Sequence, residues 1–172
     1  MVYLDRTWNK ADVIELRLPM PVQTEEWYDR AWSVVRGPLV YALKMDENWS
    51  WKPFQGRDRH YGEGAWEVTS ATPWNYCLMR DSFKAEDCVV EERIPSGTYP
   101  WNLQNAPVHL HVPARTLPHW THIDSVAFWT EEGNDTGSEL TLDLVPYGCT
   151  TLRIAAFPTR IVPWNLKFRE IY

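Results

Sequence analysis

The chain has 172 residues, enough for one ordinary domain but too few for two large ones. Its 17 Lys and Arg against 23 Asp and Glu give a net charge of −6, and so acidic a chain lacks the cationic surface that nucleic-acid binding requires. No apolar run approaches the ~20 residues that span a bilayer, and the N-terminus shows no signal-peptide pattern. We expect one domain over residues 1–172, no nucleic-acid or membrane partner, and a location in the bacterial cytoplasm or periplasm.

Apolar residues in the N-terminal part recur mainly at a spacing of two, which is typical of short antiparallel strands. This alternation predicts a first strand over residues 13–18, which ends at the prolines that follow. Residues 22–30 fit either a helical turn or a loop. Residues 32–35 and 39–44 predict one bent strand or two joined strands, with a bulge favoured at residues 36–38. Residues 45–64 are aromatic and polar without a sustained period, and they predict a long loop.

The C-terminal part shows the same strand pattern at more positions. Strands are predicted over residues 66–69, 74–79, 108–112, 125–130, 139–145 and 150–157. An irregular stretch covers residues 80–106 with Val89 and Val90 as its strand-like centre, and residues 133–137 read as a hairpin loop. About eight to ten short strands predict an all-β fold, an antiparallel and jelly-roll-like β-sandwich with long irregular loops and little helix.

The sharpest polar pattern is the pair His109 and His111. Two residues apart on a predicted strand, they project to the same face, near enough to share a metal or a ligand. No third ligand is identifiable, although His60, His119 and His122 lie in predicted loops. A half-exposed sheet face also accommodates His readily, so we expect a structural pair and no metal, with a metalloenzyme built on the pair as a remote alternative.

Recognised catalytic motifs are absent from the sequence. It contains no G-x-S-x-G, H-E-x-x-H, P-loop or G-x-G-x-x-G motif. Cys77, Cys88 and Cys149 form no C-x-x-C pair and have no base nearby in sequence, which predicts free and mostly buried thiols. We therefore assign no catalytic residue and no cofactor to this chain.

The aromatic content offers a second lead, because 11 Trp, 8 Tyr and 5 Phe exceed what a core of this size needs. The C–H faces of sugars stack on aromatic rings, so the loop around residues 49–61 could form a glycan platform. Its candidate binding residues are Trp49, Trp51, Phe54, Arg57 and Tyr61. The alternative is that these rings cap the sandwich or dock on a neighbouring domain.

Five ordered segments resemble one family of glycosidases. Residues 6–20 resemble the pattern R-x-W-x-x-G-D-x-I-x-L-x-L-P-M, with Ala11 where that pattern has Gly. The other segments are R-G-P-L-V-Y-A at 36–42, P-W-N-Y at 73–76, A-R followed by P-H-W at 114–120, and L-V-P-Y-G-C-T-T-L-R-I-A-A-F-P at 144–158. The series is similar to the C-terminal β-sandwich of glycoside hydrolase family 127, the β-L-arabinofuranosidase-like enzymes.

The resemblance implies a domain without the family's chemistry. Such enzymes carry catalysis on an N-terminal (α/α)6 barrel with a zinc-bound cysteine, and this chain has neither a Cys-Cys pair nor a Glu-x-Cys motif. It implies that the chain braces that absent barrel and edges its substrate cleft or a homodimer contact. The parent enzyme would act on arabinofuranosides or related plant glycans. It also marks Arg36, Trp74, Asn75, Arg115, Pro146, Tyr147 and Arg153 as residues that specify the fold. The alternative function is a carbohydrate-binding module that uses the aromatic loop on plant-derived oligosaccharides.

Overall fold

The computed structural model describes residues 3–27, 30–123, 126–128 and 136–161. Its strands are β1 (Val22–Glu26), β2 (Trp32–Arg36), β3 (Leu39–Leu43), β4 (Glu47–Pro53), β5 (Gly64–Ser70), β6 (Tyr76–Met79), β7 (Val89–Glu92), β8 (Val108–Thr116), β9 (Thr121–Ile123), β10 (Val126–Phe128), β11 (Glu139–Pro146) and β12 (Thr159–Arg160). Short 3-10 helices are η2 (Gly56–Tyr61), η3 (Ala85–Asp87) and η4 (Tyr147–Cys149). This architecture confirms the all-β prediction with little helix.

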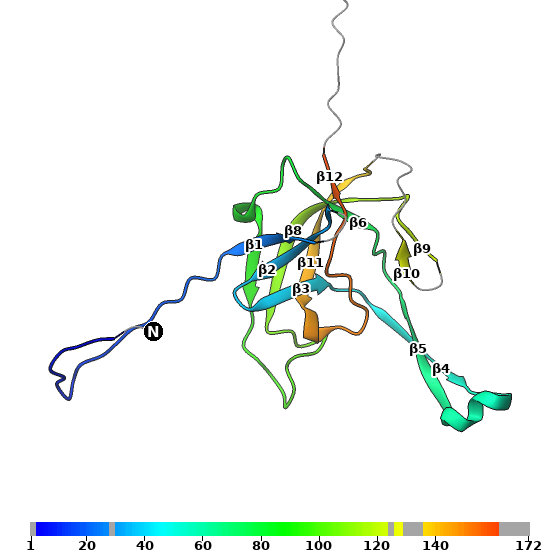
Figure 1. The fold of residues 1–172 in the computed structure, drawn as a ribbon, viewed down its shortest axis with the longest axis horizontal. Helices are drawn as coiled ribbons and strands as arrows, with labels where there is room; N and C mark the ends of the chain where they lie inside the picture. Colours follow the sequence, from blue (N-terminus) through cyan, green and yellow to red (C-terminus); the bar gives the residue numbers. More distant parts are fainter. Residues whose placement is uncertain (1–2, 28–29, 124–125, 129–135, 162–172) are drawn as a thin grey trace, which may run out of the picture.

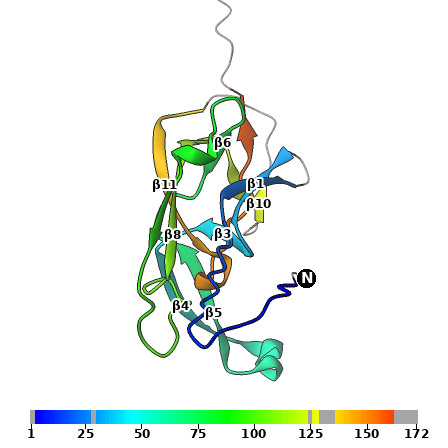
Figure 2. The ribbon, with the colours of Figure 1, turned by 90° about the vertical axis from the view of Figure 1, so that its left-hand side faces the viewer.

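The main sheet is strongly curled (Figures 1 and 2). Its strand order is β1-β2-β3-β11-β8-β6-β12, and β7 also pairs with β8. The pairs are antiparallel except for β6 with β12, which is parallel. Trp32 and Phe157 exchange two backbone hydrogen bonds of 2.8 Å, and Leu43 donates to the carbonyl of Ile154. The segment before β12 therefore lies between β2 and β3 where those strands separate, and it closes the curled sheet.

The hydrophobic core lies on the inner face of this curl. Leu142 stands opposite Val112, and Leu144 stands opposite both Leu110 and Leu43. Each of these side chains is buried, because alternate residues of a strand point to the same face. The strand predicted over residues 139–145 is thus confirmed, and along it Leu142 and Leu144 are buried while Thr141 and Asp143 lie on the other face.

Of the residues expected to specify the fold, Arg36, Arg115 and Asn75 bond to other segments of the chain. The Arg36 guanidinium pairs with Glu92 at 2.7 Å, and that of Arg115 pairs with Glu139. Asn75 Nδ2 donates a hydrogen bond to the Leu117 carbonyl, and the backbone N–H of Leu117 donates to the Asn75 carbonyl. The Trp74 ring meets the Trp120 ring edge-on at 5.1 Å, and Arg153 stacks on Tyr147 at 4.8 Å.

The predicted strand over residues 13–18 is wrong. The segment is extended but unpaired, and it belongs to an N-terminal arm, residues 3–20, that stands away from the sheet (Figure 1). Within the described chain, no backbone N–H of residues 13–21 donates to another backbone group. A strand pattern without a neighbouring strand forms no ladder. Residues 22–30, which fitted either a helical turn or a loop, contain β1 instead.

Two predictions in the middle of the chain also change. Residues 36–38 form a tight hairpin between β2 and β3, not a bulge, with Val35 opposite Val40 and Gly37 at φ +56°. Residues 45–64 are not a long loop, because β4 pairs with β5 over its whole length. The tip of that hairpin contains η2 (Figure 1).

The C-terminal predictions are confirmed in part. The strands around residues 66–69, 74–79, 89–90, 108–112 and 139–145 appear as β5, β6, β7, β8 and β11. Residues 150–157 form no strand, apart from the bridge at Phe157, because their backbone hydrogen bonds to Leu43 and Trp32, at Ile154 and Phe157, do not form a continuous ladder. Of residues 125–130 only β10 is described, and residues 133–135 of the predicted hairpin loop lie outside the described residues.

Candidate functional site

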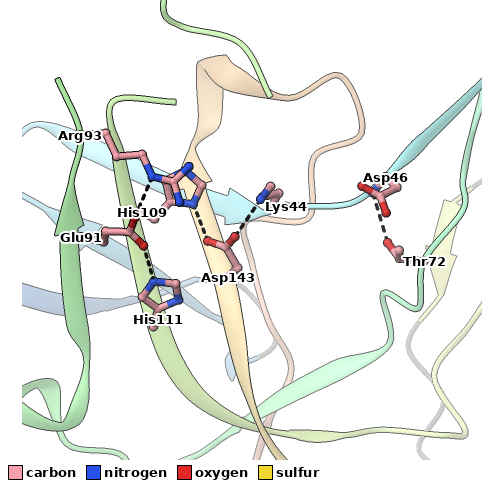
Figure 3. A network of polar contacts seen from close by, with 8 residues as sticks. All are labelled: Lys44, Asp46, Thr72, Glu91, Arg93, His109, His111 and Asp143. Atoms are coloured by element: carbon pink, nitrogen blue, oxygen red, sulfur yellow. Dashed lines mark hydrogen bonds and ion pairs between the residues drawn. The ribbon is translucent and has the colours of Figure 1, made fainter. Parts of the chain in front are cut away.

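The two histidines lie on the outer face of β8, as their spacing predicts. Their ring centroids are 6.5 Å apart and the rings are nearly parallel. His109 is fully buried, and its Nδ1 lies 2.6 Å from Asp143 Oδ1 on β11. The other oxygen of Asp143 meets the Lys44 ammonium at 3.0 Å, just after β3 (Figure 3). Since a carboxylate only accepts, Nδ1 of His109 carries the proton and donates it.

A second acidic residue holds the other histidine. His111 Nε2 lies 3.0 Å from Glu91 Oε2 on β7, and Glu91 Oε1 accepts from Arg93 Nε at 2.7 Å (Figure 3). The hydrogen bond from Arg93, followed by that from His111, lowers the pKa of Glu91 from 4.5 to about 2. Each carboxylate in this network is therefore matched by a cation and a histidine.

His109 is better suited to joining strands than to catalysis. The free nitrogen of His109, Nε2, is buried and has no hydrogen-bond partner among the described residues. A buried imidazole that no substrate can reach cannot act as a general base. Within the described part of the chain, no group of three or more His, Cys, Asp or Glu side chains could hold a metal ion. The network joins β3, β7, β8 and β11 across one face.

The sequence did not reveal Asp143, Glu91, Lys44 or Arg93 as partners of the histidines. Asp143 and Lys44 are separated by 99 residues, and Glu91 and His111 by 20. The sequence around Asp143 shows only that it alternates with leucines, and this alternation predicts that it lies on the polar face of its strand. Which strand would lie beside it is a property of the tertiary fold.

The aromatic residues predicted to bind glycan lie on the β4–β5 hairpin. Trp49 and Trp51 share one face with Trp66 of β5, and the Trp66 ring meets theirs edge-on at 6.2 and 5.4 Å. All three side chains are exposed, by 52%, 45% and 58%. The opposite face is polar and carries an ion pair between Lys52 and Glu67. The hairpin therefore presents one uncovered aromatic face.

The remaining candidates lie at the hairpin tip. Arg57 and Tyr61 belong to η2 and are exposed, and half-buried Phe54 donates its backbone N–H to Glu63. The structure therefore separates the predicted platform into a ladder of tryptophans on the strands and a polar tip. Trp66, which sequence reasoning placed in a separate strand, is the ring that joins the ladder.

The base of this hairpin is anchored to the body by Glu47. Its Oε1 accepts from the backbone N–H groups of Thr151 and Leu152, at 2.8 and 3.1 Å, and from the Thr150 hydroxyl. Burial raises the pKa of Glu47, but these hydrogen bonds outweigh burial and leave it below the usual value. The hairpin is thus held at a defined point beside η4.

The cysteines supply no activated nucleophile. All three are free thiols, as predicted, and Cys77 and Cys149 are buried. Burial raises the pKa of Cys77 to about 11, and burial together with Asp87 and Glu86 does the same for Cys88. Such thiols are almost wholly protonated at neutral pH.

Comparison with known proteins finds no matching family model, no matching curated protein and no matching solved structure. Among the described residues there is also no helix whose length and apolar character would let it cross a membrane.

Proposed function

We propose that this chain is a non-catalytic β-sandwich domain that docks on and braces a larger glycosidase of the β-L-arabinofuranosidase-like class. The proposal rests on the ordered sequence segments that resemble that family. Its single strongest structural support is the N-terminal arm, whose apolar side chains Ile14, Leu16 and Leu18 are 60%, 76% and 71% exposed along one edge. Apolar surface left uncovered on this scale marks an interaction site.

The arm has the chemistry of a strand that joins a partner's sheet. Its apolar residues alternate with Glu15 and Arg17, which pair with each other at 2.7 Å. Before it, a turn is held by Asp12, whose carboxylate accepts from the Asn9 backbone and from Arg6. An ordered turn followed by an unpaired, alternating segment supports docking by strand addition, in which main-chain hydrogen bonds supply affinity.

The test is to produce this chain and the helical barrel expected beside it as two separate polypeptides. We expect them to copurify, and we expect Leu16→Asp to abolish that complex while the free energy of unfolding of the chain changes by less than about 0.5 kcal/mol. The matched control is Leu110→Ala, which should lower stability by about 2 to 5 kcal/mol. A complex that forms equally well with Leu16→Asp contradicts docking through the arm.

The non-catalytic part of the proposal has its own assay. The purified chain, given zinc and a reductant, should release no sugar from aryl arabinofuranosides. Turnover that survives repurification would show that the chain carries its own catalytic residues.

Carbohydrate binding by the hairpin is the second candidate function, and the exposed tryptophans favour it. Trp66 is edge-on to both neighbours, so the three rings do not share one plane as a flat platform would. Affinity electrophoresis against arabinans, hemicelluloses and pectins tests this function. If it is correct, Trp49→Ala and Trp51→Ala abolish retardation and leave the thermal midpoint nearly unchanged; if the rings only dock a neighbour, no retardation is seen.

A further inference from the structure

A groove of about 790 Å³ lies on the outer side of β2 and β3, and its lining includes no residue of the arm or of the hairpin ladder. Four amphipathic aromatic rings surround it: Trp27, Tyr99, Trp101 and Tyr147. They come from three separate segments of the chain, because Tyr99 and Trp101 share one loop, and each is at least 40% exposed. The size is that of a small-ligand site, for which ~300 to 1,000 Å³ is usual.

The groove has one nearly buried polar side chain in its lining. Ser33 of β2 lines it and is only 3% exposed. A serine hydroxyl can both donate a hydrogen bond to a ligand hydroxyl and accept one from it. The position of Ser33 thus favours a ligand that both donates and accepts hydrogen bonds.

Two of the aromatic walls are held in place before any ligand arrives. The Asn102 side chain donates to the Tyr99 carbonyl at 2.6 Å and accepts from the N–H groups of Gln104 and Asn105, which fixes the turn that carries Trp101. The Arg153 guanidinium stacks on the Tyr147 ring at 4.8 Å. A preorganised wall lowers the entropy cost of binding.

The lining selects a neutral ligand, because no charged residue contributes to it among the described residues. Trp and Tyr rings offer an apolar face together with N–H or O–H groups. A ligand that matches both features has an apolar face and a hydroxylated edge. We propose that this groove, and not the hairpin, is a binding site for a neutral oligosaccharide a few sugar rings long.

The test uses the whole chain and ligand-observed saturation-transfer NMR, followed by isothermal titration. The probes are three neutral oligosaccharides, arabinohexaose, xylohexaose and cellohexaose, and a decaproline peptide, because aromatic grooves also bind polyproline. We expect saturable binding of at least one oligosaccharide and none of decaproline. Trp101→Ala should weaken that binding by about tenfold or more, and Ser33→Ala by about fivefold.

The matched control is Trp49→Ala, which removes an exposed tryptophan from the hairpin and should change the affinity by less than about twofold. Thermal unfolding of each variant establishes that it is folded, and Ser33→Ala keeps the test decisive if Trp101→Ala does not fold. The proposal is overturned if none of the three sugars binds, if decaproline binds instead, or if Trp49→Ala removes binding and Trp101→Ala does not. Each of these outcomes leaves docking through the arm standing.

Discussion

Asp143 stands opposite His111 in the β8–β11 ladder, yet its carboxylate bonds to His109, two residues along the strand. Glu91 on β7 stands opposite His109, but its carboxylate bonds to His111. Two diagonal contacts therefore link β8 to the strands on either side. Because the side-chain period of a strand is two, a slip of one residue would remove both contacts from this face, so the network helps to define the register.

The first prediction concerns Asp143. Asp143→Ala leaves the Nδ1–H of the buried His109 without an acceptor and the Lys44 ammonium without its partner. We expect a loss of about 2 kcal/mol in the free energy of unfolding, measured by urea denaturation. Asp46→Ala, an exposed acidic residue three positions from β3, is the control and should change it by less than about 0.5 kcal/mol. Equal effects of the two substitutions would show that the network contributes no stability.

The loss of folding stability at acid pH should depend on Glu91. Its pKa is about 2 in the folded chain against an ordinary value of 4.5, so the folded state binds the proton less tightly than the unfolded state does. The resulting stabilisation is complete above pH 4.5 and is lost as the pH falls toward 2. Urea midpoints measured across that window should fall less steeply for Glu91→Gln than for the unchanged chain. Identical slopes would contradict the pairing with Arg93 and His111.

The thiols should react slowly. With a pKa of about 11, fewer than about one in a thousand of the Cys77 or Cys88 side chains is ionised at neutral pH. Iodoacetamide at pH 7.5, followed by mass spectrometry of peptides, should label neither residue appreciably in the folded chain. All three cysteines should react in urea, and the labelling of half-buried Cys88 should rise with pH. Rapid labelling of Cys88 near neutrality would contradict its raised pKa.

The hairpin between β2 and β3 requires glycine at position 37. Gly37 has φ +56°, and a Cβ there would lie 2.8 Å from Met20 Sδ. We expect Gly37→Ala to lower the free energy of unfolding by about 1 to 2 kcal/mol. Gly148→Ala is the matched control, since a Cβ at Gly148 meets nothing within 4 Å. A neutral Gly37→Ala would show that the turn relaxes without cost.

The sequence by itself predicted the strands whose evidence is local. In residues 108–112 and 139–145 the apolar and polar residues alternate without interruption, and β8 and β11 cover both ranges. The shared face of His109 and His111 follows from the same period of two. The strand around Trp49 and Trp51 was not predicted, because aromatic residues alternate there with polar ones. Its apolar partner, Trp66, lies on the other side of the hairpin tip.

Only the tertiary structure decided which segments meet. Residues 13–18 have as clear an alternation as β11, but a strand needs a neighbour, and within the described chain none lies beside them. The acceptors of the two histidines come from β7 and β11, and the aromatic walls of the groove come from three segments. Strand pattern is a property of consecutive residues, whereas pairing and the assembly of a site depend on contacts between residues far apart in the chain, which local periodicity does not encode.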